Sequence, residues 1–157
     1  MKNLKHIEVE TVGEIIVGYR RKENIKIMQQ PCITQSKQTA DYLRGLFVPE
    51  TLAHKEEMFL LLLNRQNRIL GWAKLSSGGI SGTVLDKKVV FQIALNANAS
   101  GIILCHNHPS GNLTPSQADN QLTKEVKDGG RILDIAILDH IILTPDSYYS
   151  YADEGTL

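Results

Sequence analysis

Residues 102–119 read IILCHNHPSGNLTPSQAD, a stretch that combines an apolar run, a polar loop and the start of a helical pattern. Its first four residues, Ile102 to Cys105, are a short apolar run typical of a buried strand. A polar loop follows, and from Ser116 to Asp128 the pattern is helical, with Gly129 and Gly130 as the predicted stop. A buried strand that leads through a loop into a helix is one step of an α/β sheet.

The remaining segments of the chain supply the other layers of such a fold. Residues 58–63 and 69–75 predict a hairpin around a polar turn, and the first of these runs, apolar on both faces, is expected inside the sheet. The other predicted elements are strands at 7–10, 14–19, 132–138, 140–143 and 148–151, and helices at 35–47 (capped by Thr34 or Ser36 and ended by Pro49) and 86–98. This order predicts one α/β domain with a mixed central sheet flanked by helices.

Length and composition fit a single domain without structural disulfides. The chain has 157 residues, 42% of them hydrophobic, and 17 basic residues balance 17 acidic ones. A net charge of zero counts against a broad nucleic-acid-binding surface, which needs clustered Lys and Arg. No apolar run reaches the roughly 20 residues of a membrane-spanning helix, and the first residues lack the apolar core of a signal peptide. We therefore expect a cytoplasmic protein in which Cys32 and Cys105 are free thiols.

The loop of the opening stretch carries three metal-binding side chains. His106 and His108 stand two apart at the end of a strand, so both imidazoles project from one face, and Pro109 favours an extended backbone at His108. Asp119 lies one turn inside the helix that begins at Ser116. Two imidazoles and a carboxylate with an open fourth position are the ligands of a catalytic zinc, which lowers the pKa of its bound water to about 7.

Plainer interpretations exist for each part of this pattern. Ser116-x-x-Asp119 after a proline resembles a helix N-cap, and a single His-x-His pair is more often an ordinary surface or core feature than a metal site. The full pattern His-x-His-x7-Ser-x2-Asp, however, is expected by chance in about 5 of 10,000 chains of this composition, so the joint motif favours a metal site.

Two other families and one other ligand are excluded. In the nucleases named after the letters HNH, those residues are spread along a longer unit rather than adjacent. The zinc deaminases need His-x-Glu and a later Pro-Cys-x-x-Cys, which this chain lacks. Cys105 is expected to point to the face opposite His106. Histidine and carboxylate therefore remain the predicted ligands.

Hydrolysis at such a metal also needs a general base, and the loop supplies none. Glu56 and Glu57 precede the central apolar strand and are the candidates. Period-two alternation groups Glu56 with Met58 and Glu57 with Phe59, so the burial pattern leaves the choice between them open.

The spacing His106-x-His108-x7-Ser116-x2-Asp119 with an upstream glutamate resembles the JAMM motif of the JAB/MPN metallopeptidases. The wording HNHPSGN resembles the RadC-like branch, and the similarity runs from about residue 56 to the C-terminus. The resemblance implies a JAB/MPN-like fold of cytidine-deaminase-like architecture in residues 35–157. Residues 1–34 are predicted to form a β-like extension before it. The resemblance also implies zinc ligands at His106, His108 and Asp119, an acid/base at Glu56 and an oxyanion donor at Ser116.

Three functions are open at this point. The resemblance favours a zinc-dependent hydrolase of amide or isopeptide bonds, acting on a peptide or protein through a metal-bound water that a glutamate activates. One alternative is a DNA-associated RadC-like protein linked to repair; the other is a non-catalytic metal-binding interaction module. RadC-like proteins commonly carry an N-terminal helix-hairpin-helix, which residues 1–34 are not expected to contain. A DNA-binding role would have to use the following basic residues: Arg20, Arg21, Lys22, Arg65 and Arg68.

Two further histidines, His140 and His54, lie outside the motif. His140, between Asp139 and an apolar run, is expected to support the site rather than to bind the metal. His54, near the two glutamates, is expected to be exposed.

Overall fold

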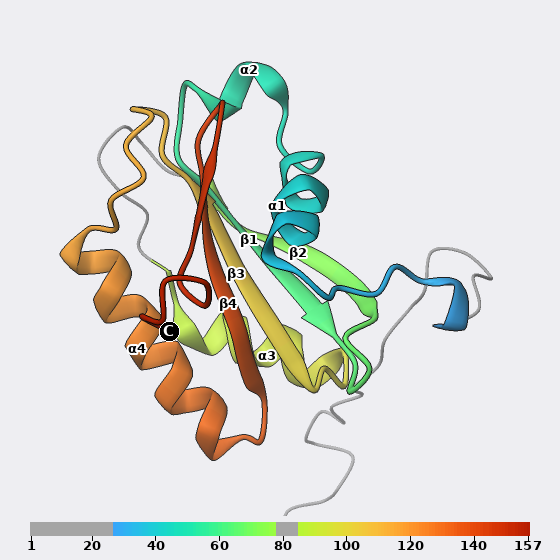
Figure 1. Ribbon diagram of the computed structural model, residues 1–157. Coiled ribbons are helices and arrows are strands. Elements are labelled where there is room, and N and C mark those ends of the chain that lie inside the picture. Colours follow the sequence, from blue (N-terminus) through green and yellow to red (C-terminus); the bar gives the residue numbers. More distant parts are fainter. Residues whose placement is uncertain (1–26, 78–84) are drawn as a thin grey trace, which may run out of the picture.

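The computed structural model describes residues 27–77 and 85–157 (Figure 1). The predicted strands at 7–10 and 14–19, and most of the extension at 1–34, lie outside the described residues. The elements are η2 (Ile27–Gln29), α1 (Ser36–Arg44), α2 (Pro49–Leu52), β1 (Glu57–Leu63), β2 (Ile69–Ser77), α3 (Lys87–Asn96), β3 (Gly101–Asn107), α4 (Gln117–Ile132), β4 (Ala136–Leu143) and β5 (Tyr148–Ser150). They form a single α/β domain, as predicted.

The five strands form one mixed sheet in the order β2-β1-β3-β4-β5. β1 is antiparallel to both β2 and β3, β3 is parallel to β4, and β5 returns antiparallel to β4. All seven residues of β1 are buried, and the strand has a neighbour on each side, which confirms its predicted place inside the sheet. The parallel pair β3–β4 is joined through α4, the usual crossover of an α/β unit.

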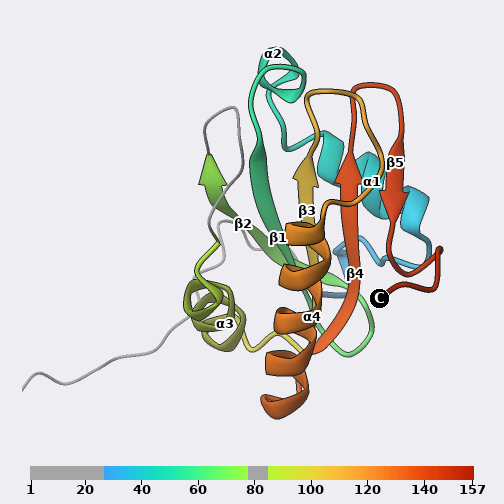
Figure 2. The ribbon, with the colours of Figure 1, turned by 90° about the vertical axis from the view of Figure 1, so that its left-hand side faces the viewer.

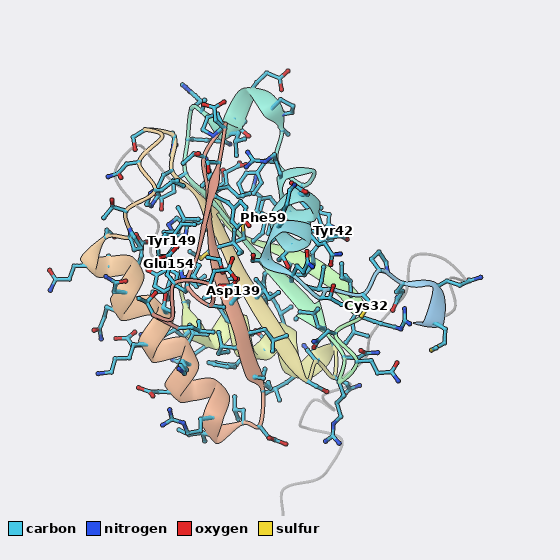
Figure 3. The ribbon with its side chains drawn as sticks, in the orientation of Figure 1. Cys32, Tyr42, Phe59, Asp139, Tyr149 and Glu154 are labelled. Atoms are coloured by element: carbon cyan, nitrogen blue, oxygen red, sulfur yellow. The ribbon has the colours of Figure 1, made fainter. Side chains whose placement is uncertain are left out.

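Helices cover both faces of the sheet, and this explains why β1 is apolar on both sides. Phe59, Leu61 and Leu63 pack on the side of α1, where Tyr42 also lies (Figure 3). Leu60 and Leu62 pack on the other side, against residues of α3 and α4. Figure 2 shows α3 and α4 together in front of the sheet and α1 behind it. Successive side chains of β1 therefore face the helices on opposite sides of the sheet.

The end of α4 and the start of β4 differ from the sequence prediction. α4 runs through Gly129 and Gly130 to Ile132, so the predicted stop at the glycines was wrong. β4 accordingly begins at Ala136, and the two strands predicted between 132 and 143 are one. Gly130 is there for packing: a Cβ on it would lie 2.5 Å from the carbonyl oxygen of Ile135.

The segment after α1 also differs from the prediction. The helix ends at Arg44, and Pro49 does not terminate it but opens the short α2, because proline suits the first position of a helix. The N-cap of α1 is Gln35, without a side-chain cap bond, rather than Thr34 or Ser36. None of the helices in the described ranges combines the length and the apolar character needed to cross a membrane.

Gly130→Ala will lower the free energy of unfolding by about 1–3 kcal/mol, although alanine is the better helix former. The new methyl group would meet backbone that cannot move without disturbing the start of β4. Gly129→Ala is the matched control, because its Cβ would meet the ring of the half-buried Phe91 at 2.7 Å, and a side chain can turn away. Urea unfolding of both variants measures the difference. A Gly130→Ala protein as stable as wild type would contradict this packing.

Candidate metal centre

The opening stretch of sequence places its three polar side chains at one end of the sheet. β3 carries His106, and its pairing with β4 continues one residue further, since the His108 N–H donates to the Leu143 carbonyl at 2.8 Å. The loop at 108–116 then leads into α4, at the end of the sheet where α2 also lies (Figure 1). Asp119 follows in the first turn of α4.

The three predicted ligands meet in space. The Nε2 atoms of His106 and His108 are 3.0 Å apart, and Nε2 of His106 lies 3.2 Å from Oδ1 of Asp119. Nε2 of His108 lies 3.5 Å from Oδ2 of Asp119. Ligands about 2.0–2.1 Å from a tetrahedral zinc are separated by about 3.3–3.4 Å, which is close to the His106–His108 and His106–Asp119 distances, whereas the His108 contact is to the other oxygen of Asp119. Within the described ranges, these are the His, Cys, Asp or Glu side chains that could hold a metal ion together.

The tautomer of His108 also suits a metal ligand. Its Nδ1 lies 2.6 Å from the carbonyl oxygen of Asn112. A carbonyl can accept but not donate, so in the neutral ring Nδ1 carries the proton and Nε2 keeps its lone pair. That lone pair faces His106 and Asp119.

Electrostatics keep the Asp119 carboxylate ionised. Burial alone would raise the pKa of Asp119, but its contacts with His106 and His108 outweigh burial and hold the pKa well below the ordinary value. The same carboxylate raises the pKa of His108. Asp119 is 8% exposed, and a buried carboxylate that faces two imidazoles is a favourable place for a cation.

Ser116 forms the helix cap that the plainer interpretation predicted. Its hydroxyl accepts from the Asp119 N–H at 3.1 Å and donates to Asp119 Oδ2 at 2.7 Å, while its own N–H donates to the same oxygen at 2.7 Å. The cap and the metal site are thus compatible, because the cap holds Oδ2 and orients Asp119 toward the histidines. Ser116 itself is exposed beside the site.

The two candidate glutamates lie in different surroundings. Glu57 is 2% exposed and bonds to Lys74 at 2.6 Å, with Lys55, Thr51 and Ser77 at 3.2 Å. Burial raises the pKa of Glu57, but the two lysines outweigh it and bring the pKa below its usual value. This carboxylate is engaged on the α1 side of the sheet.

Glu56 instead lies on the side of the metal centre. Met58 pairs with His106 across β1 and β3, and Glu56 lies two residues before Met58, which corresponds to the same side of the sheet. The charge of Glu56 contributes to the raised pKa of His108, after the larger effect of Asp119. Glu56 is half-buried and, within the described part of the chain, forms no hydrogen bond or ion pair. Its role as the acid/base stays a prediction, and its position is compatible with it.

Sequence reasoning missed Asn107, which lies between the two histidines and faces the other way. Its fully buried side-chain amide donates to the carbonyls of Leu52 at 2.7 Å and Lys55 at 2.8 Å, and accepts from the Glu57 N–H at 2.8 Å. These bonds bracket the backbone of Glu56 on both sides. The available signal was an amide at a core-facing position of a strand, which must find partners when buried.

Asn107→Leu will lower the free energy of unfolding by about 3–5 kcal/mol, because two carbonyls and one N–H are left buried without partners. Asn120→Leu is the control: Asn120 is an exposed asparagine with one side-chain bond, from the Tyr151 hydroxyl, and a small change is expected. Chemical denaturation of both proteins gives the comparison. Equal losses in the two variants would show that the Asn107 bonds contribute little.

The remaining candidates behave as predicted. His140 lies behind His106, with Nε2 2.8 Å from Nδ1 of His106, and burial lowers its pKa well below the ordinary value. His54 is exposed. Cys105 is buried in the core on the α1 side, where burial raises its pKa, and so it does not face the site.

Comparison with known proteins gives the family. The family model of the RadC-like JAB domain matches residues 33–156. The chain is 47% identical over 147 residues to a UPF0758 protein of Flavobacterium johnsoniae, covering 94% of this chain and 62% of the relative. It is 37% identical over 153 residues to a UPF0758 protein of Chlorobaculum parvum, covering 98% of this chain and 66% of the relative.

A third relative is the UPF0758 protein YfjY of Escherichia coli K12, 41% identical over 103 residues, which cover 66% of this chain and 64% of that protein. The chain thus spans less than two thirds of the length of these relatives. The match of the family model over most of the chain, together with identities well above 30%, shows that the chain belongs to the RadC-like JAB domain family.

Proposed function

We propose that this domain is a zinc-dependent hydrolase of amide or isopeptide bonds in a peptide or protein substrate. One observation carries the proposal: the ligand atoms of His106, His108 and Asp119 lie together, and the charge of Glu56 acts on His108. Two imidazoles and a carboxylate suit zinc, and they leave a fourth position for substrate or water.

A zinc ion held by these three residues would polarise a substrate carbonyl and lower the pKa of water to about 7. Glu56 accepts the proton of the attacking water and passes it to the leaving amine. It suits this task because its carboxylate is half-buried and has no competing hydrogen bond within the described part of the chain. Glu57, held by two lysines on the other side of the sheet, cannot reach the same atoms.

Ser116 stabilises the developing oxyanion of the substrate carbonyl. Its hydroxyl bonds to Asp119 Oδ2, but the Ser116 N–H bonds to that same oxygen. The hydroxyl can therefore turn to the substrate without releasing the carboxylate. A single donor of this kind contributes about 3–4 kcal/mol to catalysis.

No specific observation favours a DNA-associated role. Arg68 donates to the Gln30 carbonyl at 2.8 Å and is half-buried, and Arg20, Arg21 and Lys22 lie outside the described residues. The interaction-module alternative differs from the hydrolase in turnover, not in metal binding.

The test of the proposal is hydrolysis of a panel of peptides and isopeptide-linked substrates by the full chain. The zinc-loaded protein is compared with the same sample after chelation and after zinc is restored, and with His108→Ala. We expect turnover that disappears on chelation, returns with zinc and is absent from the variant. Hydrolysis that survives chelation contradicts the proposal, and bound zinc without turnover across the panel favours the interaction module.

A further inference from the structure

A row of buried polar contacts runs behind the metal centre from one predicted ligand to another. Nδ1 of His106 lies 2.8 Å from Nε2 of His140, and Nδ1 of His140 lies 2.7 Å from the Thr123 hydroxyl. That hydroxyl donates to the Asp119 carbonyl at 2.7 Å. His106 and His140 are fully buried and Thr123 is 3% exposed, so each polar atom depends on its neighbour in the row.

The direction of every hydrogen bond in this row follows from its last member. A carbonyl can accept but not donate, and the Thr123 hydroxyl has one proton, which goes to Asp119. Thr123 must then accept a hydrogen bond from Nδ1–H of His140. A neutral His140 with its proton on Nδ1 has a lone pair on Nε2, which accepts from Nδ1–H of His106. His106 is left with its lone pair on Nε2, the atom that faces Asp119 and His108.

The surroundings of His140 hold its ring in place. Its ring stacks on Tyr151, with centroids 5.0 Å apart and planes 8° from parallel. The Tyr151 hydroxyl donates to Asn120, so it does not compete for the nitrogens of His140. The hydrogen-bonding partners of the His140 ring are His106 of β3 and Thr123 of α4, and no carboxylate bonds to it within the described residues.

We propose that Thr123 and His140 are positioning residues that fix His106 in the tautomer with the proton on Nδ1, so that Nε2 is presented to the metal. Thr123 thereby couples the ligand on β3 to the backbone of the ligand on α4. The inference rests on the metal site of the proposed function and not on hydrolysis. In general, such supporting hydrogen bonds change metal affinity by about 10- to 100-fold when they are removed.

Thr123→Val and Thr123→Ser form a matched pair for the test. Valine has the shape of threonine without the hydroxyl, whereas serine keeps the hydroxyl. In Thr123→Val the Nδ1–H of His140 loses its acceptor, so His140 moves its proton to Nε2 and His106 must then carry its own proton on Nε2. We expect zinc affinity, measured by competition with a chromophoric chelator, to fall about 10- to 100-fold in Thr123→Val and to stay near the wild-type value in Thr123→Ser.

A second measurement does not depend on the variants being folded. Long-range proton–nitrogen NMR spectra of the zinc-free wild type show which ring nitrogens carry protons. We expect Nδ1–H for both His106 and His140. A wild-type His106 without a proton on Nδ1, or a folded Thr123→Val protein that binds zinc as tightly as wild type, would overturn the proposal. A wild type that binds no zinc would overturn the metal site itself, while the spectrum still reports on the row of hydrogen bonds.

Discussion

Glu56→Gln will hydrolyse substrate about 10²- to 10⁴-fold more slowly than the wild type and will bind zinc with unchanged affinity. Glutamine keeps the size of the side chain but cannot accept the proton of the attacking water. Glu56 is not one of the three converging ligands, so the metal remains bound. Steady-state turnover on a substrate found in the panel, with zinc content measured on the same sample, checks both halves of the prediction.

Glu57→Gln is the matched control one residue away. It removes a buried carboxylate that bonds to Lys74 and Lys55 on the opposite side of the sheet. We expect a loss of about 1–3 kcal/mol in the free energy of unfolding and ordinary turnover per folded molecule. If Glu57→Gln instead abolished turnover and Glu56→Gln kept it, the assignment of the acid/base would be reversed.

Local patterns were enough to predict most of the fold and the convergence of the three ligands. The spacing of His106 and His108 on a strand determines that both face one side, and the Ser116-x-x-Asp119 cap determines how the carboxylate is turned. β1 was recognisable because a strand covered on both faces is apolar throughout. Each of these inferences needs only residues that are near one another in sequence.

The parts that sequence reasoning missed depend on contacts between distant segments. Alternation within β1 could not show which glutamate shares the side of His106, because that depends on the pairing of Met58 with His106. The hydrogen bonds of the Asn107 side chain join residues about fifty positions apart in sequence. α4 continues through its two glycines. The backbone of residue 135 lies too close for a Cβ at position 130, and this contact, rather than a helix end, explains the glycine there.

Removing any one of the predicted metal ligands is expected to have the largest effect on zinc binding. Each of His106, His108 and Asp119 supplies one corner of the site, and two protein ligands are fewer than zinc sites in proteins use. Each alanine variant should therefore lose zinc at concentrations that saturate the wild type. Asp119→Ala also removes the carboxylate partner of the Ser116 cap, so its fold needs checking by circular dichroism.

The most direct test of this account is the metal content of the purified wild type, His106→Ala, His108→Ala and Asp119→Ala after zinc loading and removal of free metal. His54→Ala, which changes an exposed histidine outside the site, is the control. We expect one zinc ion per chain in the wild type and in His54→Ala, and none in the three folded ligand variants. Equal zinc content in all five proteins, or no zinc in the wild type, would contradict it.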